Sequence, residues 1–265
     1  MTTFVFDYVD RLDEQWNEVD ILLNEAKKVQ HSNVDLYHAL CRSASILMVA
    51  HFEGFTKDLC KNIISDLNSN CKFENLPMPI KMTGCKKYLG FDKKVIPDYD
   101  LKLREMIEDL SKADGFSICY TAFLFEKNKN PKPDVLKEVL NRFGIEDVFK
   151  NLHESGFEGA FISKSSLERL LKRMRTIVKR SVESFPYLCS DVKLKKFKLK
   201  SCKYNGRTIW QTFLDDVNQK RHAIAHGNTF SNDNEYPVLV ERMNKIRLIQ
   251  YLIIYLSCYS AVNIK

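Results

Sequence analysis

The segment DDVNQKRHAIAHGNTF, residues 215–230, brings one arginine and two histidines together within six positions. Imidazole exchanges protons near neutral pH, and a guanidinium group stabilises a phosphate that gains negative charge. His222 and His226 share one face of a helix, whereas Arg221 and His226 lie roughly 140° apart on an ideal helix. Two explanations are open: the histidines form a metal-binding pair, or the helix ends at His226 and lets its ring and Arg221 converge.

The neighbouring residues favour convergence over a metal site. Gly227 stands where a left-handed residue commonly follows a helix. A metal site needs a third ligand, and the residues between the histidines, Ala-Ile-Ala, include no glutamate of the zinc-binding H-E-x-x-H type. We therefore expect no metal and no other cofactor. Without a metal, one histidine can deprotonate a ribose 2′-OH, a second can protonate the leaving 5′-oxygen, and arginine can stabilise the charged phosphorane.

The small residues in the same stretch indicate a close contact. Ala223 and Ala225 would allow another backbone to approach this surface. A cationic helix tip of this kind can meet its own copy across a two-fold axis. We therefore expect a homodimer with a composite active site that contains two copies of Arg221 and of His226.

Apolar residues that recur every three or four positions indicate five long helices. They are expected at residues 4–30, 33–67, 163–185, 206–226 and 238–262. Shorter helices are expected at 100–112 and 134–143, whereas the apolar run 116–125 fits either a strand or a buried helix. Residues 70–100 contain three prolines and two glycines and are expected to be irregular.

The predicted fold class is all-α, an antiparallel helical bundle with an irregular basic insert between two helix pairs. The expected units are an N-terminal helical pair at 1–69, a mixed helical and basic insert at 70–205, and a C-terminal helical pair at 206–265 that carries the Arg-His motif. Within the insert, residues 191–206 fit a basic connector or a two-stranded excursion.

Positive charge is concentrated in one part of the chain. The net charge is +7, but residues 164–207 hold 14 Lys or Arg against three acids, a local charge of +11. Such a field indicates a polyanionic partner, with RNA or DNA before a membrane. The lysines of 193–203 could contact phosphates while Phe197 stacks on a base, and the same pattern fits an edge strand protected by lysines. The candidate RNA-binding residues are Lys220, Lys195, Lys196, Lys198, Lys200 and Phe197.

Arg221-His222-Ala-Ile-Ala-His226 resembles the R-x(4–6)-H motif of the HEPN superfamily, including the polar residue after the arginine. SASILMVAHFEGFTKDL, residues 43–59, resembles the corresponding helix of bacterial HEPN-like nucleases, and the resemblance covers roughly 6–68 and 206–262. It implies a dimeric HEPN-like bundle and a metal-independent endoribonuclease that leaves 2′,3′-cyclic phosphate and 5′-OH ends. It also implies a toxin or antiphage defence effector, with an antitoxin or defence-complex protein as a partner. By this match Arg221 and His226 carry catalysis and His222 assists.

Three further residues are candidates for a supporting role: His51, Glu53 and Asn218. His51 and Glu53 could line the cleft, or His51 could be a core histidine and Glu53 a partner of Lys57 at i+4. The alternative function is a non-catalytic HEPN nucleotide- or RNA-binding module, or an adaptor in a defence complex.

The remaining composition indicates a cytoplasmic protein. The eight cysteines include no C-x-x-C pair, as expected of free thiols in a reducing compartment. The N-terminus lacks the basic and apolar regions of a secretory signal. The apolar stretch 248–262 contains Gln250 and is shorter than the ~20 residues that cross a bilayer, so we expect no membrane association.

Overall fold

The computed structural model describes residues 2–124, 132–190, 192, 195–199, 204–227 and 235–262. Its regular elements in these ranges are helices, with no strand among them, which confirms the predicted all-α class. The α-helices are α1 (Phe4–Val29), α2 (Val34–Asn70), α3 (Met78–Leu89), α4 (Tyr99–Lys112), α5 (Pro133–Arg142), α6 (Val148–Leu152), α7 (Lys164–Val182), α9 (Ile209–Ala225) and α10 (Tyr236–Val262). Short 3-10 turns lie at Phe73–Asn75, Tyr120–Phe123 and Gly156–Phe161.

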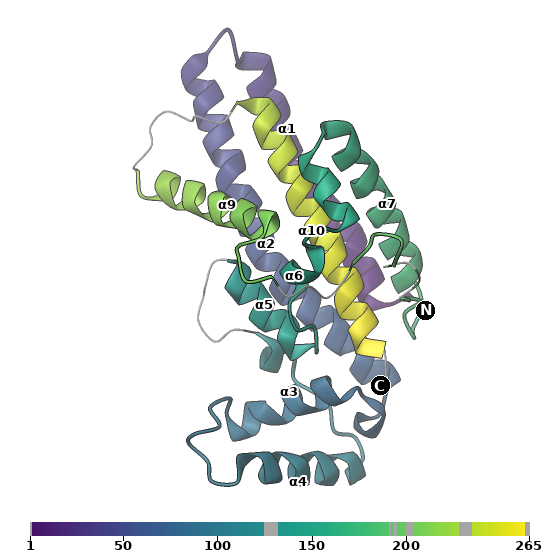
Figure 1. The fold of residues 1–265 in the computed structure, drawn as a ribbon. Helices are drawn as coiled ribbons and strands as arrows, with labels where there is room; N and C mark the ends of the chain where they lie inside the picture. Colours follow the sequence, from purple (N-terminus) through teal and green to yellow (C-terminus); the bar gives the residue numbers. More distant parts are fainter. Residues whose placement is uncertain are drawn as a thin grey trace.

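Helices α1 and α2 form a long antiparallel hairpin (Figure 1). Asn33 caps α2, because its side-chain oxygen accepts a hydrogen bond from the backbone N–H of Leu36 at 3.0 Å. Near the other end of the hairpin, the Asp66 carboxylate accepts hydrogen bonds from the N–H groups of Phe4 (2.8 Å) and Val5 (3.1 Å). Two of the free amides in the first turn of α1 are thereby satisfied by the last turns of α2.

Helix α10 is the central element, as its nearly continuous apolar sequence predicts. It contacts α2 and α1 on one side and α7 on the other (Figure 1). Inside the bundle, Trp16 donates its indole N–H to the Gln250 side-chain oxygen at 2.9 Å, so this glutamine is buried with a partner on α1. Helices α1, α2, α7 and α10 therefore form the centre of the bundle, whereas α9, the fourth long helix predicted at the ends of the chain, packs mainly against α2, α5 and α6.

The middle of the chain is more helical than its prolines and glycines predict. Residues 78–89 form α3, where an irregular segment was expected, because Pro79 lies in the first helical turn and needs no hydrogen-bonded N–H there. The apolar run 116–125 is neither strand nor long helix in its described part; it contains the 3-10 turn Tyr120–Phe123. Helices α4 and α5 appear close to where they were predicted.

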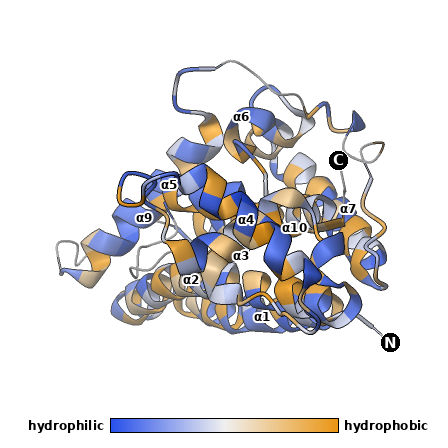
Figure 2. Cartoon of the chain, turned by 90° about the horizontal axis from the view of Figure 1, so that it is seen from below, coloured by the Kyte–Doolittle hydropathy of each residue, from blue (hydrophilic) through white to orange (hydrophobic). Residues whose placement is uncertain are grey.

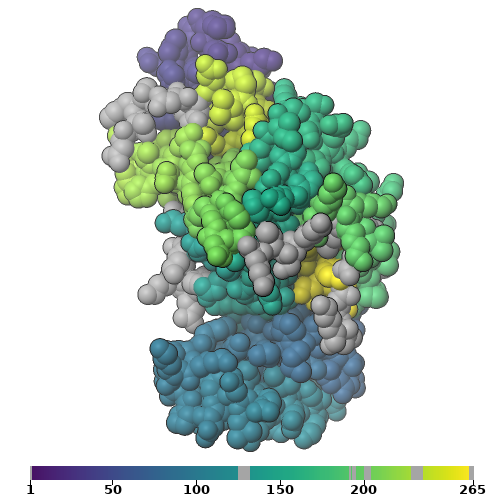
Figure 3. All heavy atoms as spheres, viewed as in Figure 1, coloured from purple at the N-terminus to yellow at the C-terminus, as the bar shows by residue number. Residues whose placement is uncertain are grey.

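Helices α3 and α4 pack on each other at the end of α2 and form a separate lobe (Figure 3). Among the helices of the described ranges, none combines the length and the apolar character that a bilayer crossing demands.

Candidate active site

Helix α9 carries the Arg-His motif and is anchored by its first three turns. Thr208 and Gln211 form a capping box, in which Gln211 Oε1 accepts from Thr208 N at 2.9 Å and Thr208 Oγ1 accepts from Gln211 N at 3.3 Å. The inner face of the helix contacts α2, α5 and α6. Its buried apolar residues are Trp210, Leu214 and Val217. Beyond them the last two turns are half-buried or exposed, so the motif lies on a projecting helix end.

The end of α9 has the predicted geometry. Ala225 is its last residue, His226 occupies the capping position, and Gly227 has a φ of 69°. Glycine adopts this left-handed conformation without a steric penalty, which explains why the helix stops here. The predicted helix end at His226 and the left-handed Gly227 are both confirmed.

The two motif histidines lie against each other at this end. The ring centroids of His222 and His226 are 4.1 Å apart, with 35° between the ring planes, and both residues are exposed. The backbone N–H of His226 donates to the carbonyl of His222 at 3.1 Å, which keeps the two rings together. Arg221 is half-buried, and among the described residues it forms no ion pair with a carboxylate. Convergence of Arg221 with His226 stays a prediction.

The histidine pair has no third metal ligand close by in the described ranges. No group of three or more His, Cys, Asp or Glu side chains with suitable geometry occurs there. The arrangement at the end of α9 is therefore two imidazoles in contact, tilted by 35°, and a guanidinium on a neighbouring face of the same helix end.

An acidic residue one turn before the motif ties α9 to α10, a feature that the sequence analysis did not identify. The Asp216 carboxylate lies 3.2 Å from Lys220 Nζ and 3.3 Å from a guanidinium nitrogen of Arg242. Arg242 is buried on α10; burial lowers its pKa, and Asp216 opposes that shift. The i, i+4 spacing of Asp216 and Lys220 could have indicated the first contact, but Arg242 is distant in the sequence. Lys220, a candidate RNA-binding residue, is thus half-exposed and paired.

The candidate supporting residues lie on inner surfaces. Asn218 is buried and donates its side-chain N–H to the Leu214 carbonyl at 2.8 Å. His51 packs edge-on against Trp16, with centroids 5.8 Å apart, and its Nε2 lies 3.5 Å from a Glu18 oxygen. Burial lowers the pKa of His51 and the Glu18 charge opposes this. His51 therefore faces α1, but it is half-buried and its Nε2 has no hydrogen-bond partner among the described residues, so the hydrogen bond of its structural interpretation is not formed.

The i+4 ion pair expected for Glu53 is not formed. Glu53 is half-buried on α2 and Lys57 is exposed, and no salt bridge joins them in this described helix. A supporting role for Glu53 remains a prediction.

Phe197 does not lie where a base could stack on it, which corrects the sequence-based expectation. Its side chain is 3% exposed and stacks on Phe157, with ring centroids 4.6 Å apart. Phe197 has two further contacts. The Arg173 guanidinium carbon lies 4.6 Å from the centroid of the ring, and the Gly156 N–H donates to the Phe197 backbone carbonyl at 2.8 Å. Residues 195–198 form a helical turn instead of the alternative edge strand. Lys195, Lys196 and Lys198 are exposed on this turn, and Lys200 lies outside the described residues.

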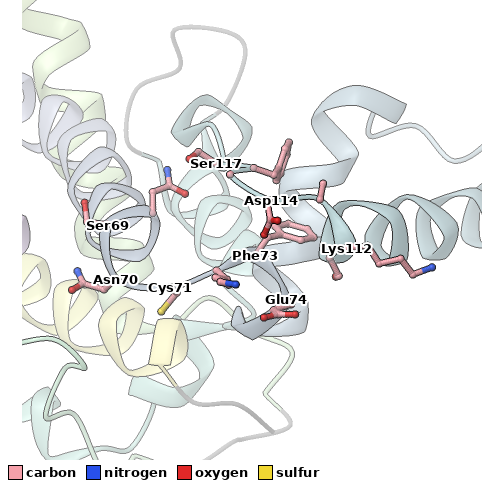
Figure 4. A pocket seen from close by; sticks show the side chains of 14 residues that line it. Ser69, Asn70, Cys71, Phe73, Glu74, Lys112, Asp114 and Ser117 are labelled. Atoms are coloured by element: carbon pink, nitrogen blue, oxygen red, sulfur yellow. The ribbon is translucent and has the colours of Figure 1, made fainter.

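A polar cleft of about 550 Å³ lies at the C-terminal end of α2 (Figure 4). It is lined by residues 68–74 and 111–117. Asn68 is occupied there with both backbone groups of Ile118, and burial raises the pKa of the Cys71 thiol, which disfavours the nucleophilic thiolate. The cleft lies between the end of α2 and the α3–α4 lobe. Its lining residues include no pair of histidines like that at the end of α9.

An all-α bundle with an Arg-His sequence at the end of α9 is compatible with the HEPN superfamily, the class of protein that the sequence resembles. The model of the family RiboL-PSP-HEPN matches residues 10–258, and the chain belongs to this family. The match includes the middle of the chain, for which the sequence analysis found no resemblance. No curated protein and no solved structure shows significant similarity to the chain. Membership of a HEPN family indicates a nuclease or RNA-binding function.

Proposed function

We propose that this protein is a metal-independent endoribonuclease that leaves 2′,3′-cyclic phosphate and 5′-OH ends. The observation that carries the proposal is the contact of two exposed imidazoles, His222 and His226, at the end of α9. One imidazole takes the proton of the ribose 2′-OH while another protonates the leaving 5′-oxygen. Arg221, which has no described carboxylate partner, stabilises the negative charge that develops on the phosphorane.

The complete site is proposed to form in a homodimer. One helix end supplies a single guanidinium, and the small side chain of Ala225 is exposed there, which favours the close approach of a second copy. An isologous contact of two α9 ends places Arg221 and His226 of one protomer beside those of the partner. Lys220 lies next to this contact and is proposed to hold the RNA backbone. In the cell, the enzyme is proposed to act as a toxin or antiphage effector, with an antitoxin or defence-complex protein as its partner.

Cleavage of RNA by the purified protein in EDTA tests the chemistry. The 5′ ends should accept phosphate from polynucleotide kinase without prior phosphatase treatment, and the 3′ ends should resist polyadenylation until the cyclic phosphate is removed. We expect His226→Ala to lower cleavage by about 10²- to 10⁴-fold, the usual contribution of a general acid or base. His31→Ala is the matched control, because His31 is an exposed histidine in the α1–α2 turn.

Two outcomes would contradict the assignment. Cleavage by His226→Ala at the wild-type rate would exclude this residue as acid or base, and RNA binding without cleavage by the wild type would favour the non-catalytic alternative.

Co-expression of Arg221→Ala with His226→Ala tests the dimer, because mixed dimers regain one Arg-His pair only if the site is shared. Growth arrest and RNA loss on induction of the wild type, but not of Arg221→Ala, would support a toxin or effector role.

A further inference from the structure

The outer face of α7 carries cations that the proposed active site does not use. An advance of 100° per residue places them within an arc of roughly 100°, opposite the buried face of the helix. They are Arg169, Lys172, Arg173 and Arg180. All four are exposed, and none forms an ion pair with a described carboxylate. The arc contains one acid, Glu183, at the C-terminal end of the helix.

The other cations of α7 are neutralised, which distinguishes this arc from the flanks of the helix. Arg175 lies 2.6 Å from an Asp13 oxygen of α1. Lys179 pairs with Asp10 of the same helix α1. Lys164 and Glu168 pair weakly within α7, at 4.0 Å. The pairs with Asp13 and Asp10 therefore hold α7 against α1, while the charges of the arc face solvent.

The turn 195–198 extends this cationic face. Phe197 is wedged between Phe157 and the Arg173 guanidinium, so the turn lies directly beside the arc. Lys195, Lys196 and Lys198 are exposed around the buried phenylalanine, without a described acidic partner. We call the four cations of the arc and these three lysines the basic surface.

We propose that the basic surface binds RNA through its phosphates. The arc from Arg169 to Arg180 is about 16 Å long, which matches about five phosphates of a stacked strand. All residues of α7 are described, and none of its large apolar side chains is exposed. Protein interfaces have apolar cores and membrane-surface helices insert an apolar face, so a purely polar, cationic arc fits phosphates best.

The basic surface and the end of α9 lie on different sides of the molecule. Figure 1 shows α9 and α7 on opposite sides of α10, and the view from below shows the same separation (Figure 2). RNA bound along α7 is therefore held outside the α9 site of the same protomer, and binding can be measured separately from cleavage. The choice of RNA over DNA rests on the proposed function, whose chemistry requires a 2′-OH.

Binding of a fluorescent single-stranded RNA to the full-length protein, in the His226→Ala background, tests the proposal. The variant Arg169→Gln/Arg180→Gln removes two charges and leaves the Arg173–Phe197 contact intact. If each lost contact acts only through counterion release, the affinity should fall about 25-fold at 0.1 M salt. The negative slope of log K against log[salt] should become less steep by about 1.4. Lys102→Gln/Lys112→Gln, on exposed positions of α4, is the charge-matched control and should bind like its parent.

Four results would overturn the proposal. Three of them concern nucleic acid: an unchanged affinity of the α7 variant, an equal loss in the α4 control, and tighter binding of a DNA oligonucleotide of the same sequence. A loss of binding to phosphatidylserine vesicles without a loss of RNA binding would also overturn it, in favour of a membrane partner. Binding is measured in a variant that lacks His226, so the result does not depend on cleavage. If the wild type never cleaves RNA, the proposed function is wrong, but the measured binding to the basic surface is unaffected.

Discussion

Substitution of Phe197 separates a structural role of this residue from contact with a base. The ring is almost completely buried between Phe157 and the Arg173 guanidinium, and its backbone carbonyl is bound by the Gly156 N–H. If this packing holds the turn 195–198, Phe197→Ala should destabilise the fold, whereas Phe197→Leu should preserve most of it.

The size of the effect follows from the buried area. A phenylalanine side chain buries at least about 150 Å², which at about 25 cal/mol per Å² gives roughly 4 kcal/mol. This is an upper estimate, because unfolded chains already bury part of that area. We expect Phe197→Ala to lower the free energy of unfolding by about 3 kcal/mol and Phe197→Leu by about 1 kcal/mol. For a chain of this size, 3 kcal/mol corresponds to a decrease in Tm of about 6–12 °C.

Thermal unfolding and RNA binding, measured on both variants, give the decisive comparison. A ring that stacks on a base contributes about 1–3 kcal/mol, so its loss would weaken binding about 5- to 150-fold. The structure predicts that Phe197→Leu binds RNA like the wild type and that Phe197→Ala loses both stability and affinity. A stable Phe197→Leu protein with strongly weakened RNA binding, together with an unchanged Tm for Phe197→Ala, would refute the buried placement.

Three other predictions concern titration and backbone geometry. The pKa of the Cys119 thiol is lowered to about 7, chiefly by a hydrogen bond from Lys87. Its rate of alkylation by iodoacetamide, followed by peptide mass spectrometry, should therefore reach half of its maximum near pH 7. Lys87→Met should move this midpoint towards pH 9. The pKa of His51 is lowered by burial, so the unfolded state binds more protons than the folded state below pH 6.5. The free energy of unfolding should therefore decrease as the pH is lowered through that range. Urea unfolding should show a smaller decrease in His51→Gln. Gly227→Ala should cost about 1–2 kcal/mol because φ is positive, whereas Gly227→Asn should cost less in the same assay.

The sequence predicted those features that depend on neighbouring residues. Apolar spacing located α1, α2, α9 and α10, and Gly227 located the end of α9, because helical periodicity and left-handed glycine are local properties. In the candidate active site, too, only the local contacts could be predicted from the sequence. The i, i+4 spacing of His222 and His226 is sufficient to bring their rings together, whereas a contact of Arg221 with a partner protomer cannot be derived from spacing.

The sequence-based expectation for residues 193–199 failed because distant contacts determine the local structure there. Alternation of lysine with apolar residues in 193–199 is compatible with a strand, but Lys198 has a φ of 54° and the turn is held by partners 24 and 40 residues away, Arg173 and Phe157. Arg242 reaches Asp216 in the same non-local way.

The distribution of charge on α7 and α9 connects these observations. A lysine-rich stretch looks uniform in sequence, yet the fold neutralises Arg175 and Lys179 against α1 and leaves the outer arc without an acidic partner among the described residues. On α9, Asp216 pairs with Lys220 and Arg242, while Arg221 one residue further on has no described carboxylate. Asp10 and Asp13 of α1 hold α7, and Asp216 of α9 holds Arg242 of α10, so in both cases an acid joins the helix to the bundle. The cations that remain lie at the surface, where a phosphate can approach them without first breaking an ion pair.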